Sequence, residues 1–419
     1  MEEWKEYRLR EITVMKNGKK RSQNTGIYPV YGGNGIMDYS DSYNAENTII
    51  VGRVGAYCGC VYKSEGKCWV SDNAISVSAN GIVNTDFLYY LMTTLDFHHH
   101  HIGGAQPLMT QDIIGDFVVV IPSLPIQNQI VSILKSLDDK IEVNRRINDN
   151  LEQQAQALFK SWFVDFEPFR NQPFVESELG MIPEGWRVGT LNDFGEIVGG
   201  STPSKAKPEY YTDNGIAWLT PKDLSVSKCK FTSRGEIDIT QEGYDSCSTK
   251  LMPKGTVLFS SRAPIGYITI AKNDICTNQG FKSVIPKLAG TAFIYCFLKE
   301  STQEIENKAT GSTFKEASGS LMKSLPAIVP EKVILDDFED LMKPIYKQQE
   351  VLEDENSRLS SLRDTLLPRL MSGELSVDGL KGQQAVSPGP LGDDRRRFHS
   401  EAEKERPGSM EQISNTIAP

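Results

Sequence analysis

The side chains with the greatest chemical potential in this sequence are its cysteines and histidines. Seven cysteines are scattered along the chain, and four of the five histidines form one run, His98 to His101. Cys58, Cys60 and Cys68 resemble part of a zinc cluster, but no second Cys-x-x-Cys or His-x-x-x-His completes four ligands. An odd number of scattered cysteines is typical of free thiols in a reducing compartment. We therefore expect no metal site and interpret the histidine run as a solvated loop.

Catalytic and cofactor-binding signatures are missing from the sequence. It contains no Gly-x-x-x-x-Gly-Lys-Ser/Thr loop for a nucleoside triphosphate and no Gly-x-Gly-x-x-Gly turn that enters a helix after a strand. The Asn-Pro-Pro-aromatic tetrapeptide of amino-methyltransferases and the Pro-Asp dipeptide common in nuclease cores are absent too. A Ser-His-Asp arrangement would have to draw its base from the histidine run. These absences favour a binding role, and we predict no catalytic residue.

The charge of the chain bears on its partners. The 419 residues include 45 Lys and Arg against 55 Asp and Glu, a formal net charge of −10. This balance argues against a nucleic-acid partner, because phosphate binding requires positive potential. The charge is unevenly distributed, however: residues 185–330 carry 17 basic and 14 acidic side chains, whereas residues 331–375 carry 6 and 11. DNA therefore stays open as a partner, and we expect weak, salt-sensitive binding by this chain alone.

The hydropathy pattern bears on location. No apolar run approaches the roughly 18–20 residues that span a bilayer. The first ten residues, MEEWKEYRLR, lack the apolar core of a signal peptide. We therefore expect a cytoplasmic protein without a membrane partner.

The elements that would position any binding residues occur twice, because the sequence repeats one pattern. Each copy begins with a Trp-x-x-x-x-Leu phrase, at Trp4 and at Trp186, followed by a stretch rich in Gly and Lys. Strand-like runs follow in each copy and are broken by an Arg and a Gly, namely Arg53 and Gly55 in the first and Arg262 and Gly266 in the second. Further matches in the same order begin at Ser71 and Thr277 and at Gly103 and Ala309. The constant order indicates a tandem duplication with divergent loops.

Each copy ends in a long helical segment with a seven-residue apolar repeat, which is typical of a coiled coil. The seam positions of the first helix are Ile130, Leu137, Asn144, Leu151 and Leu158. Those of the second helix are Phe338, Ile345, Leu352, Leu359 and Leu366. We expect the two helices to pack antiparallel as a rod of about 55 Å.

Two residues, Asn144 and Pro344, depart from the pattern expected of an apolar, uninterrupted helix pair. Asn144 falls at a seam position, where a buried Asn would cost stability and fix register and partner. The alternative is a surface Asn on a kinked helix. Pro344 interrupts the second helix, and because Pro is tolerated at the first helical position, we expect the main segment to start there.

These patterns predict an α+β fold with two tandem β-rich domains separated by two long helices that form an antiparallel coiled coil. The predicted segments are a β-rich domain at 1–122, a helix at 123–168, a connector at 169–184, a second β-rich domain at 185–330, a second helix at 331–375 and a disordered tail at 376–419. In the tail, the run Arg395 to Arg397 is flanked by acids, and we interpret it as a solvated charge cluster.

This arrangement resembles the specificity subunit of Type I restriction–modification enzymes, over residues 1 to about 375. The phrases that carry the resemblance are the two Trp-x-x-x-x-Leu starts, TPKDL from Thr220, SSRAPIG from Ser260, NQGF from Asn278 and IPSLPIQNQIVSILKSLDDKIEVNRRINDNLE from Ile121. The resemblance implies that each β-rich domain is a target recognition domain reading one half of an asymmetric, bipartite DNA target. It implies that the helical rod sets the unread spacer, with half-site centres about one helical turn (~34 Å) apart.

The same resemblance implies partners and cofactors. The chain would be a noncatalytic subunit of an adenine methyltransferase/endonuclease complex, with double-stranded DNA, two methyltransferase (modification) subunits and motor–nuclease (restriction) subunits as partners. It would bind no cofactor itself, since S-adenosylmethionine, ATP and Mg would be bound by the partner subunits. The alternative is a bivalent protein-binding coiled-coil scaffold without DNA specificity, and an uncharacterised hydrolase is the weakest alternative.

Direct readout of DNA needs Arg, Lys, Asn, Gln or Ser on loops that can enter a groove. The candidates in the first β-rich domain are Lys19, Lys20, Arg21, Asn34, Arg53 and Gln106. Those in the second are Ser204, Lys205, Lys207, Lys222, Arg262, Asn278, Gln279, Thr313 and Lys315. The alternative for each is a solvated loop residue. Arg53 and Arg262 recur at equivalent positions, which favours a role in bracing the fold or contacting phosphate, because residues that read sequence should differ between the copies.

Overall fold

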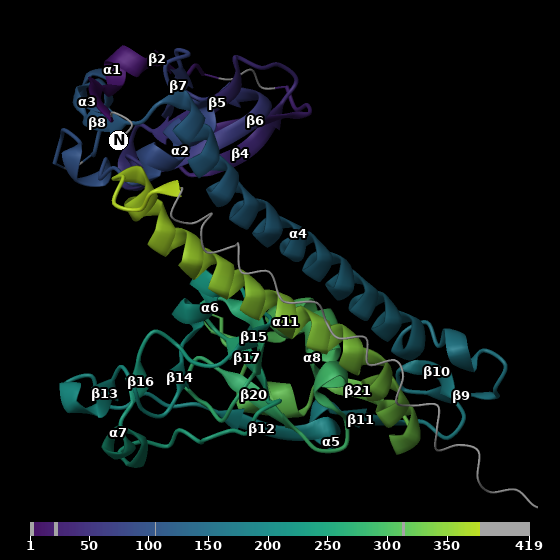
Figure 1. The fold of residues 1–419 in the computed structure, drawn as a ribbon. Helices are drawn as coiled ribbons and strands as arrows, with labels where there is room; N and C mark the ends of the chain where they lie inside the picture. The colour runs from purple at the N-terminus through teal and green to yellow at the C-terminus, as the bar shows by residue number, and fades with distance from the viewer. Residues whose placement is uncertain (1–3, 21–23, 105, 312–314, 378–419) are drawn as a thin grey trace, which may run out of the picture. The chain divides into compact units, whose positions relative to one another are not determined.

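The computed structural model describes residues 4–20, 24–104, 106–311 and 315–377. The chain forms two units: the first comprises the described parts of residues 1–130 and 368–419, and the second comprises those of residues 131–367. Each of the two long helices has residues in both units (Figure 1). The predicted tail lies outside the described residues from residue 378 onward, including Arg395 to Arg397.

The first unit is built on a six-stranded sheet. In spatial order its strands are β2 (Thr13–Asn17), β7 (Ala74–Ala79), β5 (Ala45–Gly52), β6 (Val61–Val70), β3 (Tyr28–Gly32) and β4 (Gly35–Ser40). Only the β3–β6 pair is parallel among these neighbours. A separate antiparallel pair joins β1 (Lys5–Arg8) to β8 (Val118–Ile121). The helical elements that precede the long helix are α1 (Leu9–Ile12), η1 (Gly55–Tyr57), α2 (Thr85–Thr93), η2 (His98–His100) and α3 (Gln111–Asp116).

The second unit has a five-stranded sheet. In spatial order its strands are β12 (Gly195–Gly199), β20 (Lys282–Pro286), β17 (Val257–Ser261), β18 (Ile265–Ala271) and β15 (Phe231–Thr232). Smaller pairs are β9 (Phe174–Ser177) with β10 (Gly180–Pro183), β11 (Arg187–Thr190) with β21 (Pro326–Val329), β13 (Tyr211–Thr212) with β16 (Asp238–Ile239), and β14 (Trp218–Leu219) with β19 (Cys276–Thr277). The shorter helical elements are η3 (Glu167–Phe169), α5 (Leu191–Phe194), η4 (Pro208–Tyr210), α6 (Pro221–Ser227), α7 (Gln241–Asp245), α8 (Thr291–Glu300), α9 (Thr302–Lys308) and α10 (Gly319–Lys323).

The two sheets follow one plan. The order β2-β7-β5-β6-β3 of the first unit corresponds to β12-β20-β17-β18-β15 of the second, and the last strand is parallel to its neighbour in both. The pair β1–β8 likewise corresponds to β11–β21. Each first strand leads directly into a one-turn helix with a capping box, in which the third helical residue, Glu11 or Asp193, accepts from the backbone of the capping residue. The predicted duplication is confirmed.

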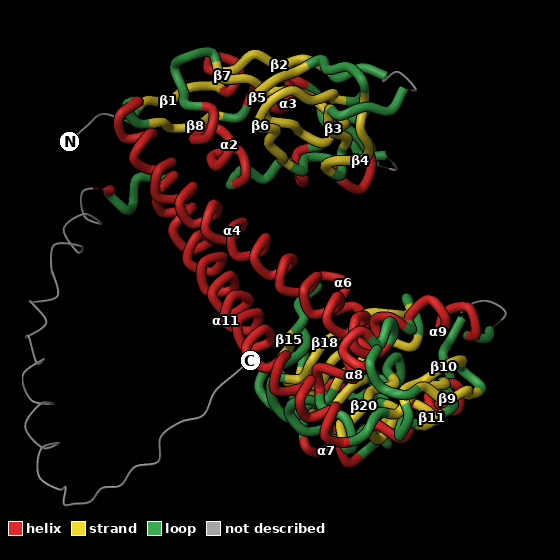
Figure 2. Tube along the Cα trace, turned by 90° about the vertical axis from the view of Figure 1, so that its right-hand side faces the viewer, coloured by secondary structure: helices red, strands yellow, loops and turns green. Residues whose placement is uncertain are grey.

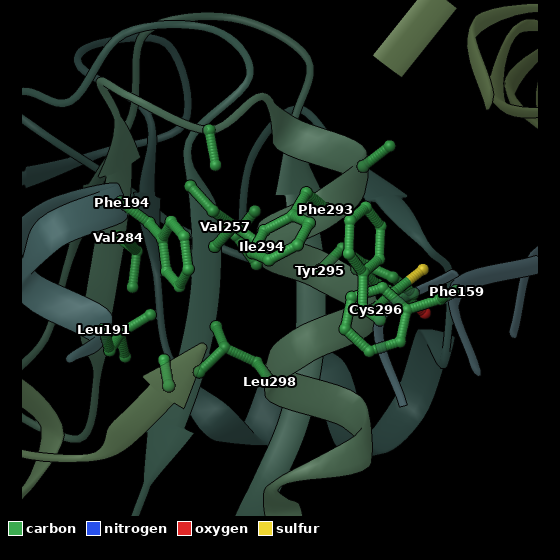
Figure 3. Packing of buried hydrophobic residues seen from close by; sticks show 14 of the residues in the cluster. Phe159, Leu191, Phe194, Val257, Val284, Phe293, Ile294, Tyr295, Cys296 and Leu298 are labelled. Carbon is green, nitrogen blue, oxygen red and sulfur yellow. The ribbon is translucent and has the colours of Figure 1, made fainter. Parts of the chain in front are cut away.

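The central strand of the sheet in the second unit is buried on both faces, with Val257 in one hydrophobic cluster and Leu258 in another. Strand β17 reads Val-Leu-Phe-Ser-Ser and all of its residues are buried. On one face, Val257 of β17 and Phe293 of α8 join a large aromatic and aliphatic core (Figure 3). That core also takes in Phe159 from the first long helix and Phe338 from the second. The second unit therefore includes the two helices in its core rather than resting on them.

The long helices are α4 (Leu124–Phe163) and α11 (Lys332–Met371), of 40 residues each. At 1.5 Å per residue, each is about 60 Å long. Within the second unit they run side by side and antiparallel (Figure 2), since Arg363 pairs with Asp138 and Gln349 contacts Asn148. This confirms the predicted arrangement.

The seam agrees with the seven-residue repeat. Four predicted positions are buried: Ile130, Asn144, Phe338 and Leu352. The other six are half-buried: Leu137, Leu151, Leu158, Ile345, Leu359 and Leu366. Asn144 is fully buried, and its amide donates to Glu355 (2.8 Å) and to Asn356 (2.9 Å) of α11. The interpretation as a surface Asn is therefore wrong.

The expectation that the second helix starts at Pro344 is also wrong. α11 begins at Lys332 and passes through Pro344 without a break. A proline in a helix removes one backbone hydrogen bond, here to the carbonyl of Asp340. Pro344 and Asp340 are both exposed, so water can solvate the free carbonyl. Buried Met342 and Tyr346 on either side hold the helix against the core.

Candidate nucleic-acid interface

Backbone hydrogen bonds fix the candidate loops of the first unit in place. Lys19, after β2, donates its N–H to the carbonyl of Val70 (3.0 Å). Arg53, after β5, donates its N–H to the carbonyl of Asn73 (2.9 Å). The loop that contains Gln106 is bonded to the Arg53 loop, because Gly55 donates its N–H to the carbonyl of Pro107 (3.1 Å). The structure thus connects the Arg53 and Gln106 loops directly.

The side chains in these loops differ in solvent exposure and in whether they are hydrogen-bonded. Lys19, Lys20, Asn34 and Gln106 are exposed. Arg53 is half-buried, and its guanidinium donates to the carbonyl of Asp72 (3.4 Å), a contact that supports the bracing role. Arg21 lies outside the described residues.

The second unit has a pocket of about 600 Å³ that brings together five of its nine predicted residues. These five are Lys205, Lys222, Arg262, Asn278 and Gln279. Lys205, Arg262 and the pair Asn278 and Gln279 lie on the loops that follow β12, β17 and β19, and Lys222 lies in the first turn of α6, which follows β14. Sequence reasoning missed the aromatic residues Tyr211 and Trp218, which also line the pocket. The adjoining phrase TPKDL was a signal for this region, but nothing in the sequence marks an aromatic on a strand as a pocket residue.

Hydrogen bonds hold the walls of this pocket. The Trp218 indole donates to the carbonyl of Ser201 (3.1 Å), and the Tyr211 hydroxyl donates to the carbonyl of Pro203 (2.7 Å). Thr202 donates its hydroxyl to the side chain of Gln279. Asn278 accepts the N–H of Gly280 (2.8 Å), which leaves its amide nitrogen as a donor. A preformed wall of this kind limits the entropy lost on binding.

The positive charges at the pocket have acidic neighbours. Lys222 pairs with Glu236 (2.9 Å), and this hydrogen bond raises the pKa of Lys222 above its ordinary value. Arg262 lies 3.5 Å from Glu316. Both pairs are at least partly exposed, so each cation can exchange its carboxylate for a phosphate at little cost. The pocket can therefore offer donors and charge to a DNA backbone or base edge.

The remaining candidates of the second unit lie outside the pocket lining. Ser204 and Lys207 are exposed on the same loop as Lys205, and the Lys207 ammonium donates to the hydroxyl of Tyr210 (2.8 Å). Lys315 is exposed and donates to the carbonyl of Glu306 (3.3 Å). Thr313 lies outside the described residues.

Metal and thiol chemistry were the other possibilities raised by the residue types. Within the described ranges, no group of three or more His, Cys, Asp or Glu side chains is placed to hold a metal ion. All seven cysteines are free thiols. In the histidine run, His99 pairs with Asp96 (2.7 Å) and is exposed. No helix in the described part of the chain is long and apolar enough to cross a membrane.

Comparisons with known proteins agree with this architecture. A family described as the Type I restriction modification DNA specificity domain matches residues 1–153 and 183–353. The specificity subunit of the type I restriction enzyme MjaIX of Methanocaldococcus jannaschii is 42% identical over 190 residues, 43% of this chain and 44% of that protein. The specificity subunit of the HindI enzyme of Haemophilus influenzae is 29% identical over 333 residues, 65% of this chain and 72% of that protein.

One solved structure shares the fold. The S subunit of a type I restriction–modification system from M. genitalium has a TM-score of 0.57 at 17% identity, covering 88% of this chain and 96% of that one. The family match falls on both halves of the chain, as the duplicated sheets require. This chain therefore belongs to the Type I restriction modification DNA specificity domain family.

Proposed function

We propose that this chain is the noncatalytic DNA-specificity subunit of a type I restriction–modification complex. Each β-rich domain reads one half of an asymmetric, bipartite target, and α4 with α11 sets the length of the unread spacer. The observation that carries the proposal is the duplicated sheet with divergent loops. One conserved frame presents two different sets of Lys, Arg, Asn and Gln at corresponding loops, and two different sets read two different half-sites.

The proposal extends to partners and cofactors. Two adenine methyltransferase subunits bind the helices, and restriction subunits join that assembly. S-adenosylmethionine, ATP and Mg are bound by these partners rather than by this chain. The acidic segment at residues 331–375, which contains α11 and carries 11 acidic and 6 basic side chains, favours protein partners there over DNA.

The proposed DNA contacts fall into two classes. Lys19, Lys20, Lys205 and Lys207 contact phosphates, because exposed ammonium groups supply charge without sequence information. Asn34, Gln106, Asn278 and Gln279 contact base edges, because amides distinguish donors from acceptors. Arg53 and Arg262 occupy equivalent places after β5 and β17, which favours a shared contact with phosphate.

The test is to co-express the full chain with its methyltransferase partner and map methylated adenines across the genome. The expected result is one split, asymmetric motif. Exchange of residues 1–122 for those of a relative should change one half-site and leave the other half-site intact. A motif that does not change on this exchange would contradict the proposal. Complete absence of DNA-dependent methylation, together with stable binding of other proteins, would favour the bivalent scaffold.

A further inference from the structure

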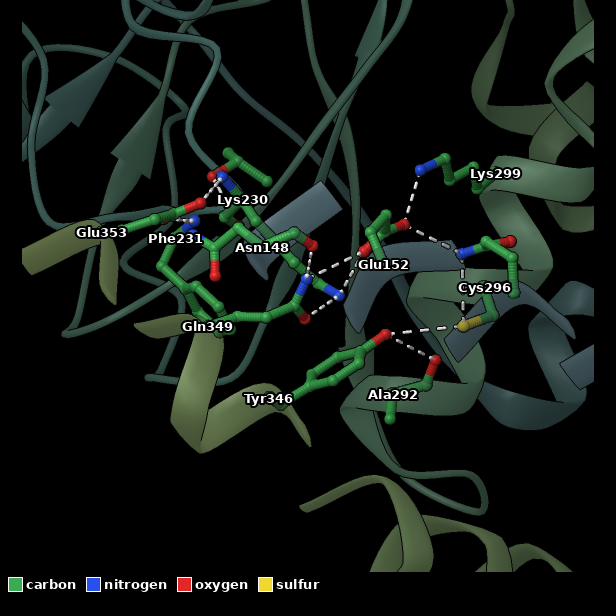
Figure 4. Close-up of polar contacts among 12 residues, drawn as sticks. Asn148, Glu152, Lys230, Phe231, Ala292, Cys296, Lys299, Tyr346, Gln349 and Glu353 are labelled. Atoms are coloured by element: carbon green, nitrogen blue, oxygen red, sulfur yellow. Dashed lines mark hydrogen bonds and ion pairs between the residues drawn. The ribbon is translucent and has the colours of Figure 1, made fainter. Parts of the chain in front are cut away.

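Lys230 is a buried cation in the second unit that the recognition of DNA does not use. It precedes β15 and is only 7% exposed. Its ammonium donates to Glu152 of α4 (2.7 Å) and to Gln349 of α11 (2.8 Å) (Figure 4). The same ammonium lies 3.5 Å from the ring centroid of Tyr346, also on α11. One side chain of the second β-rich domain thus contacts both long helices.

The backbone around Lys230 is held as firmly as its side chain. Glu353 of α11 accepts the N–H groups of Lys230 (2.9 Å) and Phe231 (3.1 Å). The carbonyl of Lys230 accepts the N–H of Ile270 in β18 (2.8 Å). The sheet, the ammonium and the two helices therefore form one connected cluster.

The helices are also bonded to each other within this cluster. Gln349 donates its amide to the carbonyl of Asn148 (3.3 Å) and to Glu152 (3.4 Å). Lys299 of α8 donates to the second oxygen of Glu152. Burial works to raise the pKa of Glu152, but Lys230 and Lys299 outweigh it and lower the pKa to about 2. Glu152 is therefore an anion between two cations at neutral pH.

A cluster of this kind is a costly way to gain stability, because well-packed apolar residues often serve as well as a buried ion pair. What the cluster does require is a defined axial position of α4 relative to α11. A shift of α4 against α11 by one residue moves Glu152 by about 1.5 Å along the axis. With the Lys230 ammonium in its present place, a shift of that size along the axis would take the 2.7 Å hydrogen bond out of the normal range. In the observed register, one ammonium reaches Glu152, Gln349 and the Tyr346 ring together, and it could not follow a displaced Glu152 without leaving the two partners on α11.

We propose that Lys230 is a positioning residue: it locks the second β-rich domain and both helices in one register and so fixes the spacer length that the protein accepts in its DNA target. This inference rests on the proposed function. It concerns the tolerance for spacer length alone, since Lys230 is buried and is not among the loop residues proposed to contact bases.

The test compares methylation maps of the full chain, co-expressed with its methyltransferase partner, for three variants. Lys230→Met removes the ammonium, and Lys230→Met with Glu152→Met also removes the carboxylate that would be left buried. Lys272→Met is the matched control. Lys272 follows β18 and pairs with Asp354 of α11, but Asp354 is half exposed, so this pair tolerates movement. Thermal unfolding establishes which variants are folded.

The expected result is that both Lys230 variants keep the two half-site sequences. Methylation at targets with a spacer one base pair longer or shorter should rise about tenfold relative to the unaltered chain. The control should keep the original spacer. Unchanged spacer stringency in a folded Lys230 variant would overturn the inference while leaving the proposed function intact. Loss of the folded state in both Lys230 variants would also overturn it, because Lys230 would then serve stability alone. A wild-type chain without any split motif would overturn both proposals.

Discussion

The two units share a frame and differ at its edges. In the first unit the sheet continues from β3 into β4, which exposes Ile36, Met37 and Tyr39. In the second unit the sheet ends at β15, and the segment from β13 to α7 forms one wall of the pocket instead. The frame is the part that both copies need in order to fold. The edges are where they diverge, and two candidate DNA contacts lie there: Asn34 between β3 and β4, and Lys222 in α6 on the wall of the pocket.

The units also differ in how they use the long helices. Helix α2 of the first unit is capped by its own Asn84, which accepts from Asp86 (2.7 Å) and Phe87 (3.1 Å). The N-cap of the corresponding helix α8 is Gly290, which has no side chain to accept a hydrogen bond, and Glu339 of α11 accepts the N–H of Ala292 instead (3.0 Å). The second unit thus depends on α11 for a contact that the first unit makes locally.

The largest expected effect compares two equivalent core residues. Phe87 and Phe293 each occupy the third position of α2 or α8, and both are buried. Replacement by Ala should lower the free energy of unfolding by about 3–5 kcal/mol in each case. Phe293→Ala should lower it more, because the Phe293 ring packs against Phe159 of α4 and Phe338 of α11, with ring centroids 5.4 and 6.5 Å apart. Urea unfolding followed by circular dichroism measures both, and a greater loss for Phe87→Ala would contradict the proposed dependence on the helices.

Acid should weaken the second unit through Glu152. Its pKa is lowered to about 2 in the folded chain, so it binds a proton less readily than in the unfolded chain. The stability that it supplies is therefore present above the ordinary pKa of Glu and is lost as pH falls from about 4.5 towards 2. A shift of this size corresponds to about 3 kcal/mol. Urea unfolding at pH 6, 4 and 3 should show this loss, and Glu152→Gln should flatten the curve.

The two helix caps predict a smaller difference. Asn84→Ala should cost about 1 kcal/mol, as for other N-caps. Glu339→Ala should cost about 2 kcal/mol, since it leaves the N–H groups at the start of α8 without their acceptor. Burial raises the pKa of Glu339, so the folded chain disfavours its charge. Glu339→Gln keeps an acceptor without that charge and should cost less than either change. Thermal unfolding ranks the three variants by their loss of stability. Equal losses for Asn84→Ala and Glu339→Ala would contradict the predicted difference between the two caps.

The smallest effect concerns the loops after β2 and β12. Lys20 and Lys205 are exposed at comparable places in the two units. If each contacts one phosphate, Lys20→Ala and Lys205→Ala should each weaken DNA binding by the methyltransferase complex several-fold. Each should also reduce the slope of log affinity against log salt by about 1. Filter binding at several salt concentrations measures the slope, and a change in the preferred sequence would instead indicate base contacts.

Periodicity and repetition in the sequence predicted the duplication, the antiparallel helices and the buried Asn144. These features depend on local patterns that recur, so one sequence reveals them. The same reasoning also named five residues that the structure places around one pocket, although their contacts with DNA stay predictions.

Other features could not be predicted, because they arise from contacts between distant segments. Lys230 looks like any other lysine in the sequence, and its burial depends on Glu152 and Gln349, which lie far away along the chain. The heptad pattern alone suggests an apolar seam and says nothing of this polar cluster. Pro344 was misjudged because a local rule for helix breaking ignores the packing of its neighbours.

The pairing of β1 with β8 has a consequence for genetic recombination between related chains. Lys5 lies opposite Ile121, so the chain enters and leaves the first β-rich domain at adjacent points, and Arg187 opposite Val329 does the same in the second. A block whose two ends meet can be exchanged for another block with the same ends without redirecting the chain on either side. A single genetic crossover on each side of such a block would then replace every loop within it at once, while the helices stay as they were.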